Sequence, residues 1–212
     1  IPEVYIDPFR ISVDGLSAGG LASWRFFQSY PKLVAACLPI SNASSSYSSI
    51  IIDNKFTPIW LFQGALDVNP APGSSQYLKS VADNAGANLT YTEYPNLGHG
   101  SWYAAWGEPD YFPYLSRAKK ENTWPLFGRS EFCNTGPGSI NTTIGVTAGF
   151  NEYQWRKNGT LLSGEGTTSN TLTVTDIGLY SCRIRKGTTW SEWSPIPVEI
   201  KYKTSTIPPT IK

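Results

Sequence analysis

The sequence predicts an α/β domain with a mainly parallel sheet, followed by a small all-β sandwich. Residues 1–130 alternate strand-like apolar runs with runs of helical periodicity, which is the order of βαβ units. Residues 131–138 are rich in loop-forming types and are expected to be a linker. Residues 139–204 hold only short β-type runs separated by turn signals, and 205–212 are expected to link to a further module.

Each expected element has a local cause. Four strands of the first part are short apolar or alternating runs, at residues 10–14, 33–40, 57–62 and 89–94. Three helices carry apolar side chains at helical spacing, at residues 18–30, 74–85 and 111–120. The strands of the sandwich are expected at residues 144–146, 153–156, 171–174, 179–185 and 198–202, with a turn at Asn158-Gly159.

Composition argues against several classes of function. A net charge of +1 with no block of like charge disfavours nucleic-acid binding. No apolar run approaches the ~18 residues of a membrane span. The single histidine cannot form a metal site that needs two imidazoles, and no cofactor or metal is expected. Charged residues are only 16% and aromatic residues 14%, which suits a secreted protein acting on carbohydrate or polymer.

The two ends of the chain read as internal sequence. Ile1-Pro2 begins without an initiator methionine, and residues 207–212 read like the start of another module. We expect the chain to be a segment of a longer bacterial protein, secreted or on the cell surface, with its signal peptide outside this chain.

The sharpest chemical signal is Gly15-Leu16-Ser17-Ala18-Gly19-Gly20. A strand is expected before it and a helix after it, as a nucleophile elbow requires. Side chains at positions 15 and 19 are expected to collide with neighbouring backbone. The backbone N–H of Ala18 would then lie where an oxyanion develops. The alternative is a Gly/Ser-rich turn of no chemical importance.

Two further residues favour the catalytic interpretation. Asp67 follows the strand at 57–62, and His99, flanked by glycines, lies in the loop after the strand at 89–94. The order serine, acid, histidine, each after a separate strand, is that of the α/β-hydrolases. The sequence therefore predicts Ser17, Asp67 and His99 as a catalytic triad.

Residues 5 to about 132 resemble the second half of an α/β-hydrolase. The resemblance is to secreted serine esterases similar to polyhydroxybutyrate depolymerases, feruloyl esterases and prolyl-oligopeptidase-like peptidases. The matching stretches are residues 7–11, 15–20, 64–67 and 98–102. The resemblance implies acyl transfer, in which Ser17 attacks the ester carbonyl, His99 carries the proton and Asp67 orients His99.

The family's sheet has eight strands, and only four are readable in this chain. The resemblance therefore implies that an N-terminal half lies in another chain or in a longer one. That half would supply the second oxyanion donor and one wall of the acyl pocket. It would also cover an unpaired buried edge of the strand that leads to Ser17. The chain alone is expected to be a poor esterase.

Other residues near the triad allow two interpretations. Trp102 and Trp106, one helical turn apart, could line the mouth of the site and stack on a sugar or phenolic ring, or could pack that helix against the sheet. Asp14 is expected to be a solvent-facing group at the end of its strand. Lys119-Lys120-Glu121 is expected to be a solvated helix end.

The sandwich resembles bacterial immunoglobulin-like modules appended to exported enzymes. Trp155 stands where such a domain keeps its core tryptophan on strand C, and Tyr180 lies two residues before Cys182, as in strand F. Ile144 and Val146 stand where such a domain has strand B, and neither is a cysteine. The inter-sheet disulfide of antibody domains therefore cannot form. Cys133 is the most plausible partner of Cys182, and Cys37 is expected to be a buried thiol.

The run Trp190-Ser191-Glu192-Trp193-Ser194 matches the WSxWS box of cytokine-receptor domains, which raises the alternative of a receptor-like binding protein. We favour a structural origin. Tyr180, Cys182 and Ile184 are expected to face the core, so Arg183 and Arg185 face outward and can interleave with the two indoles as a cation–π ladder. A sugar-binding platform needs bare indole faces, and a spacer role is favoured for this domain.

The function predicted from sequence is that of an extracellular serine carboxylic-ester hydrolase, present here as a fragment. Its expected partners are an ester-bearing polymer or polysaccharide and the remainder of the hydrolase domain. Two alternatives stay open. One is a prolyl-oligopeptidase-like serine peptidase, and the other is a non-catalytic adhesion or polymer-binding protein that retains a hydrolase-like domain.

Overall fold

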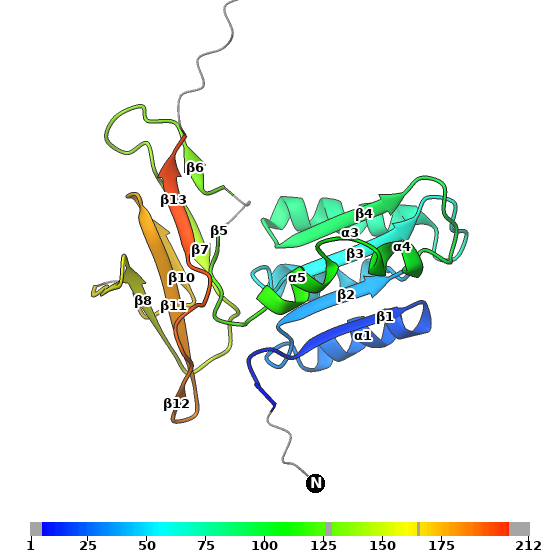
Figure 1. The fold of residues 1–212 in the computed structure, drawn as a ribbon, viewed down its shortest axis with the longest axis horizontal. Coiled ribbons are helices and arrows are strands. Elements are labelled where there is room, and N and C mark those ends of the chain that lie inside the picture. The colour runs from blue at the N-terminus through cyan, green and yellow to red at the C-terminus, as the bar shows by residue number, and fades with distance from the viewer. Residues whose placement is uncertain (1–5, 126–128, 165, 204–212) are drawn as a thin grey trace, which may run out of the picture.

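The structure, a computed structural model, describes residues 6–125, 129–164 and 166–203. Two units lie side by side: an α/β unit with a four-stranded sheet and an all-β unit (Figure 1). The sheet of the α/β unit has the order β1-β2-β3-β4, and all neighbouring strands are parallel. Its strands are β1 (Ser12–Leu16), β2 (Ala36–Ile40), β3 (Ile59–Gly64) and β4 (Leu89–Tyr94). The predicted parallel sheet is confirmed, with β2 and β3 beginning slightly later than expected.

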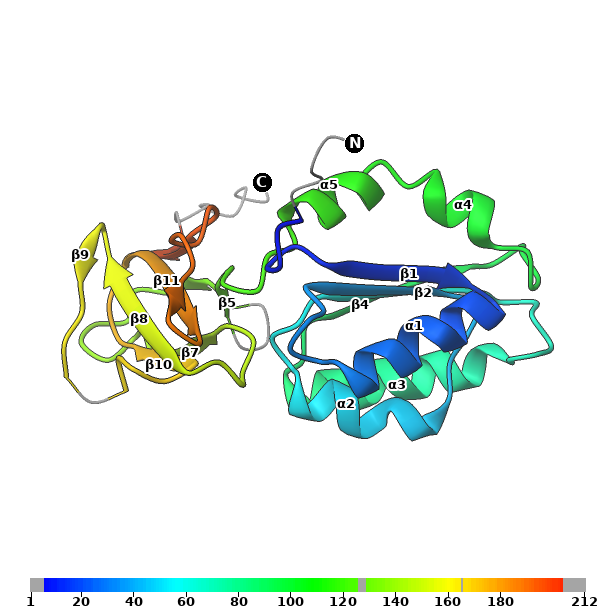
Figure 2. The ribbon, with the colours of Figure 1, turned by 90° about the horizontal axis from the view of Figure 1, so that it is seen from below.

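Helices cover both faces of this sheet (Figure 2). On one face lie α1 (Ala18–Ser29), α2 (Ser48–Asp53) and α3 (Pro72–Ala85), and on the other lie α4 (Trp102–Trp106) and α5 (Tyr111–Arg117). A short 3-10 helix (Ser45–Tyr47) leads into α2. Neither α2 nor the 3-10 helix was predicted, and α5 ends three residues before the predicted limit. The unit is therefore a three-layer α/β/α arrangement.

Alternate residues of the buried strands feed two separate cores. Cys37, Ile59 and Leu61 pack toward α1, α2 and α3 with Trp24 and Phe27 of α1. Their sequence neighbours face the other side, toward α4 and α5, and pack there with Tyr111; these are Ala36, Leu38, Ile40, Trp60 and Phe62. Burial on both sides explains why β2 and β3 are continuous apolar runs.

Strand β1 is an edge strand of the sheet, because β2 is its one paired neighbour in the described part of the chain. Its residues are half-buried except Asp14, which is exposed and accepts a hydrogen bond of 2.9 Å from the Tyr111 hydroxyl. The expected unpaired edge is present, but it is only partly buried. Asp14 faces solvent as predicted, but it lies in the middle of β1 and not at the end of the strand, because β1 continues to Leu16.

The second unit consists of two sheets around one core. One sheet has the order β10-β7-β5, and the other has the order β6-β13-β11-β8-β9 with β12 paired to β11. The strands are β5 (Trp124–Pro125), β6 (Glu131–Phe132), β7 (Thr142–Gly145), β8 (Glu152–Lys157), β9 (Thr160–Leu161), β10 (Thr171–Val174), β11 (Gly178–Lys186), β12 (Thr189–Trp190) and β13 (Val198–Tyr202). Trp155, Tyr180, Cys182 and Ile184 are buried in this core as expected.

The domain limits stay a prediction, and strand pairing qualifies two of them. β5, placed by the predicted limits in the first domain, pairs with β7, and β6, placed in the linker, pairs with β13. The last predicted linker, 205–212, lies outside the described residues.

Lys119-Lys120-Glu121 is not a solvated helix end, and this prediction was wrong. Lys120 and Glu121 are buried, and Lys120 Nζ donates a 2.8 Å hydrogen bond to the Pro8 carbonyl oxygen. Lys119 Nζ lies 2.6 Å from a Glu121 carboxylate oxygen. The segment passes between the two units, where Thr147 N–H reaches the Lys120 carbonyl, so the charged residues are enclosed by tertiary contacts.

Tyr180 and the three cysteines bear on smaller predictions. The Tyr180 hydroxyl donates a 3.0 Å hydrogen bond to the Asp176 carbonyl, as in a tyrosine corner. Cys37 and Cys182 are buried free thiols and Cys133 is an exposed one, so the proposed pairing of Cys133 with Cys182 was wrong. The resemblance to immunoglobulin-like modules stays a prediction.

The predicted cation–π ladder is confirmed. The Arg183 guanidinium carbon lies 4.8 Å from the Trp190 ring centre and 4.9 Å from that of Trp193. Arg185 lies 5.7 Å from Trp190, and Arg156, which was not predicted, lies 4.4 Å from Trp193. Guanidinium and indole groups therefore alternate in the order Arg185, Trp190, Arg183, Trp193, Arg156.

The serines of the same run join it to β11. The Ser191 hydroxyl accepts from the Ile184 N–H, and the Ser194 hydroxyl accepts from the Cys182 N–H, at 3.1 and 2.9 Å. The backbone N–H groups of the two serines donate in turn to the carbonyls of Ile184 and Cys182. The tryptophan-serine run is thus a structural edge of the second unit. Over the described residues, no helix has the length and apolar character needed to cross a membrane.

Candidate active site

Ser17 occupies a tight turn between β1 and α1. Its φ of 52° and ψ of −113° are uncommon for a residue with a side chain. A Cβ at Gly15 would lie 2.5 Å from the Gly19 backbone, and one at Gly20 would lie 2.8 Å from the Asn42 side chain. A Cβ at Gly19 would meet nothing within 4 Å, so the expected collision at that position was wrong. Gly15 and Gly20 are the glycines that this turn requires.

The turn leaves one backbone donor beside the serine. Ser17 N–H donates to the Ile40 carbonyl at 2.9 Å, which ties the turn to β2. Ala18 is the first residue of α1, so its N–H has no acceptor within the helix, and none is found elsewhere in the described residues. This N–H, at the positive end of the helix, is available to an anionic oxygen near Ser17.

Ser17, His99 and Asp67 form one hydrogen-bonded chain. His99 Nε2 lies 2.8 Å from Ser17 Oγ, and His99 Nδ1 lies 2.8 Å from Asp67 Oδ2. All three follow the carboxyl ends of parallel strands: Ser17 follows β1, Asp67 follows β3 and His99 follows β4. The predicted convergence is confirmed. The Asp67 side chain is 1% exposed and that of His99 is 41% exposed, so the imidazole faces solvent while the carboxylate is enclosed.

The Asp67 carboxylate is saturated with donors. Besides His99, Gln63 Nε2 donates to Oδ2 at 2.8 Å and Asn69 N–H donates to Oδ1 at 2.9 Å. Ser75 holds the Gln63 amide in place by donating to its oxygen at 3.1 Å. Burial raises the pKa of Asp67, but the hydrogen bonds from Asn69, His99 and Gln63 outweigh it and hold the pKa below its usual value. The carboxylate is therefore ionised.

A second network holds the histidine loop from below. Ser41, at the end of β2, is fully buried and has a φ of 51°. Its hydroxyl donates to the His99 carbonyl at 2.8 Å and lies 2.8 Å from the hydroxyl of buried Ser101. Ser41 has one hydroxyl proton, so Ser101 is the donor to Ser41. The two serines fix the backbone on which the imidazole stands.

Gly64 allows the histidine loop to approach β3. A Cβ on Gly64 would overlap the carbonyl oxygens of Leu97 and Gly98. Because Gly64 ends β3, this close approach brings the loops carrying Asp67 and His99 together. The sequence analysis used Gly64 only as part of a stretch that matches the hydrolase family, and it missed the roles of Gln63, Ser41 and Ser101. A buried glutamine in an apolar strand was the one available signal among these.

The two candidate substrate tryptophans differ in their surroundings. Trp102 is half-buried, packs against the core under α4 and α5, and meets the His99 ring edge to face at 6.1 Å. Trp106 is 38% exposed and meets Tyr103 edge to face at 6.1 Å. Trp102 thus packs against the core and also borders the candidate active site. A role in binding substrate stays a prediction for both Trp102 and Trp106. Among the described residues, no cluster of His, Cys, Asp or Glu could hold a metal ion.

Comparisons with solved structures find partial matches. A thermostable esterase is 29% identical over 54% of this chain and 32% of that chain, with a TM-score of 0.49. SOBER1 from Arabidopsis thaliana is 28% identical over 45% of this chain and 47% of that chain, with a TM-score of 0.39. A ferulic acid esterase is 15% identical over 53% of this chain and 52% of that chain, with a TM-score of 0.40. No protein-family model and no curated protein matches the chain. The chain spans about a third to a half of the length of these structures.

Proposed function

We propose that this chain carries the triad-bearing half of a serine carboxylic-ester hydrolase of the α/β-hydrolase type. One observation carries the proposal. Ser17, in its strained turn, hydrogen-bonds His99, which hydrogen-bonds Asp67, and the three follow separate parallel strands in the chain order of that fold. A structural serine does not require this backbone conformation, a half-exposed imidazole and a saturated acid together.

The geometry supports acyl transfer in two steps. Ser17 Oγ attacks the ester carbonyl while His99 Nε2 takes the hydroxyl proton of Ser17. The resulting oxyanion accepts a hydrogen bond from the Ala18 N–H. When the C–O bond breaks, His99 returns the proton to the leaving alcohol and an acyl-serine remains. Water then attacks the acyl-serine and loses a proton to His99. His99 returns this proton to Ser17 Oγ as the acyl C–O bond breaks and the acid leaves. Asp67 keeps Nδ1 protonated and stabilises the imidazolium.

The rest of the active site belongs, in this proposal, to a partner segment outside the chain. It would add a strand at the edge of β1, a second oxyanion donor and a wall of the acyl pocket. The missing donor alone would cost about 100- to 1,000-fold in turnover, so the 212-residue chain should be weakly active. The remaining segment of the hydrolase domain is thus its first proposed partner.

The proposal includes an extracellular, polymer-associated setting and a role for the second unit in it. We propose that the second unit is an immunoglobulin-like spacer, because arginines occupy the faces of Trp190 and Trp193 that a sugar would need. The substrate would be an ester group on a polymer or polysaccharide, with Trp102 and Trp106 at the mouth of the site. Secretion and substrate class follow from composition and resemblance.

The test is an assay of the full-length protein against p-nitrophenyl esters, acetylated and feruloylated polysaccharide, and short peptides. We expect ester turnover that Ser17→Ala abolishes and that Ser191→Ala, a serine change remote from the triad, leaves in place. Ester turnover that survives Ser17→Ala would disprove the assignment of the nucleophile. Cleavage of peptides without cleavage of esters would overturn the assignment as an esterase and favour a serine peptidase.

A further inference from the structure

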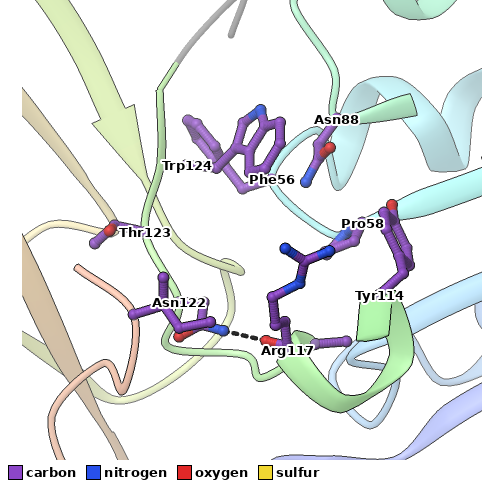
Figure 3. Close-up of a pocket in the computed structure, with 10 residues that line it drawn as sticks. Phe56, Pro58, Asn88, Tyr114, Arg117, Asn122, Thr123 and Trp124 are labelled. Carbon is purple, nitrogen blue, oxygen red and sulfur yellow. Dashed lines mark hydrogen bonds between the residues drawn. The ribbon is translucent and has the colours of Figure 1, made fainter. Parts of the chain in front are cut away.

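We propose that a cavity between the two units binds a small aromatic carboxylate. The cavity has a volume of about 280 Å³ and lies at the amino ends of strands β3 and β4 (Figure 3). The triad lies at the other, carboxyl ends of the strands. Phe56 and Pro58 precede β3, Asn88 precedes β4, and Arg117 ends α5. None of Ser17, Asp67 or His99 lines it. The proposal is therefore independent of the proposed esterase function.

The walls of the cavity are apolar and flat. The Phe56 ring comes from the α/β side, and Trp124 and Ile196 come from the all-β side. Trp124 is 38% exposed and Ile196 is 44% exposed, so described residues leave much of these large apolar surfaces uncovered. An aromatic ring is the ligand body that fits between an indole, a phenyl ring and an aliphatic side chain.

A cation and an unused donor also face this space. The Arg117 Nε donates to the Pro113 carbonyl at 3.2 Å, and within the described part of the chain the guanidinium forms no ion pair. Asn88 is 4% exposed, and its Nδ2 has no hydrogen-bond partner among the described residues. Figure 3 shows the Asn88 amide and the Arg117 guanidinium directed toward the same space. Buried donors are rarely left unpaired, so this one points to an acceptor other than the described residues, which in this proposal is the ligand.

Charge and size select a carboxylate on a short stem. One guanidinium and one amide N–H match the two oxygens of a singly charged carboxylate, whereas a phosphate dianion would exceed the single cation. The volume of about 280 Å³ lies just below the ~300–1,000 Å³ typical of ligand sites, which limits the ligand to one ring with a short acid chain. Asn122 Oδ1, a second polar atom without a partner in the described residues, offers an acceptor for a hydroxyl group on that ring.

The probe is 3-phenylpropanoate, titrated into the intact chain by calorimetry. We expect one molecule to bind per chain, and the uncharged 3-phenylpropan-1-ol to bind at least about tenfold more weakly, because it lacks the charge-assisted hydrogen bonds. Equal binding of acid and alcohol would overturn the carboxylate assignment. Absence of binding by the unmodified chain at about 10 mM, a limit that corresponds to less than ~3 kcal/mol, would overturn the site.

Three variants locate the bound acid. Arg117→Gln and Trp124→Ala change exposed side chains of the cavity, and each should weaken binding of 3-phenylpropanoate by about 10- to 100-fold. Arg25→Gln is the matched control, because Arg25 is an exposed arginine on α1 that does not line this cavity. Unchanged thermal unfolding without ligand shows that each variant is folded. Retained affinity in both cavity variants, or an equal loss in Arg25→Gln, would place the acid elsewhere and overturn the proposal.

Discussion

The buried hydroxyl of Ser41 donates a 2.8 Å hydrogen bond to the backbone carbonyl of His99. Ser41 forms no hydrogen bond with Ser17 or Asp67, yet it joins the end of β2 to the loop that presents the imidazole. Its φ of 51° also places it in a region that side-chain-bearing residues rarely adopt. A strained residue that supports a candidate catalytic loop is a positioning residue, and its role can be separated from the strain.

Ser41→Ala should lower kcat of the full-length esterase by about 10- to 100-fold with little change in KM, because a loop shift of even 1 Å misplaces His99. Ser41→Gly removes the same hydroxyl but suits the positive φ. If the hydroxyl matters, both variants lose activity alike while Ser41→Gly is the more stable. Full activity in Ser41→Gly would show that the hydrogen bond is dispensable.

Asp67→Asn tests the acid of the triad. An asparagine keeps the size of the side chain but cannot hold the His99 Nδ1 proton as a carboxylate does. We expect kcat of the full-length protein to fall by about 10,000-fold without loss of the folded state. Asp14→Asn, which changes an exposed acid in the middle of edge strand β1, is the control and should stay active. A fall of less than about tenfold in Asp67→Asn would remove Asp67 from the mechanism.

The elements that sequence predicted well are those with a clear period. β1, β3, β4, α1 and α3 lie close to their predicted limits because turn residues bound them on both sides. The α2 helix was not predicted, because its first turn follows a run of serines that shows no apolar periodicity. The triad was predictable because chain order and strand ends define it.

What sequence could not provide depends on tertiary contacts. Lys120 and Glu121 look like a solvated pair in the sequence, but contacts with Pro8 of the first unit and Thr147 of the second enclose them. Arg156 joins the ladder because β8 pairs with β11 in a register that places Arg156 opposite Ser181. A side chain at Gly20, and not at Gly19, would collide with a neighbour, because Asn42, which follows β2, lies against Gly20. Such contacts join residues far apart in the chain.

The cysteines make a prediction that distinguishes free thiols from a disulfide. Burial raises the pKa of the Cys37 and Cys182 thiols well above the ordinary value, so neither forms a reactive thiolate near neutral pH. A thiol reagent such as DTNB should titrate one thiol, Cys133, in the native chain and all three after unfolding in denaturant. Absence of a native reactive thiol, restored by reductant, would revive the Cys133–Cys182 pair.

Lys120 should make stability depend on pH. Burial, with Lys186 as a second cause, lowers the pKa of Lys120 to about 8, against ~10.4 in an unfolded chain. Between these values the unfolded chain binds more protons at this site than the folded one, so the contribution of Lys120 to stability rises with pH. Below pH 8 both states are protonated and the contribution is constant.

The measurement compares wild type with Lys120→Met by urea unfolding from pH 7 to 10. The stability of wild type relative to the variant should rise above pH 8, by at most about 1.4 kcal/mol per pH unit. The difference between the two proteins is the informative quantity, because the buried cysteines and tyrosines titrate equally in both. A difference that stays flat over this range would mean that Lys120 keeps an ordinary pKa.

Trp193 lies between Arg183 and Arg156 in the cation–π ladder. Trp193→Ala should lower the free energy of unfolding by about 1–2 kcal/mol, because each stacked pair contributes ~0.5–1 kcal/mol at an exposed site. Leu179→Ala removes an exposed apolar side chain from β11 that has no cation partner in the ladder, and should change stability by less than about 0.5 kcal/mol. Arg183→Lys should lie between them, because an ammonium keeps the charge but cannot stack flat on two indoles. Equal stability of Trp193→Ala and Leu179→Ala would mean that the alternating planes contribute nothing. A sugar could then displace the arginines from the indole faces without loss of stability, and the sugar-binding role would regain its basis.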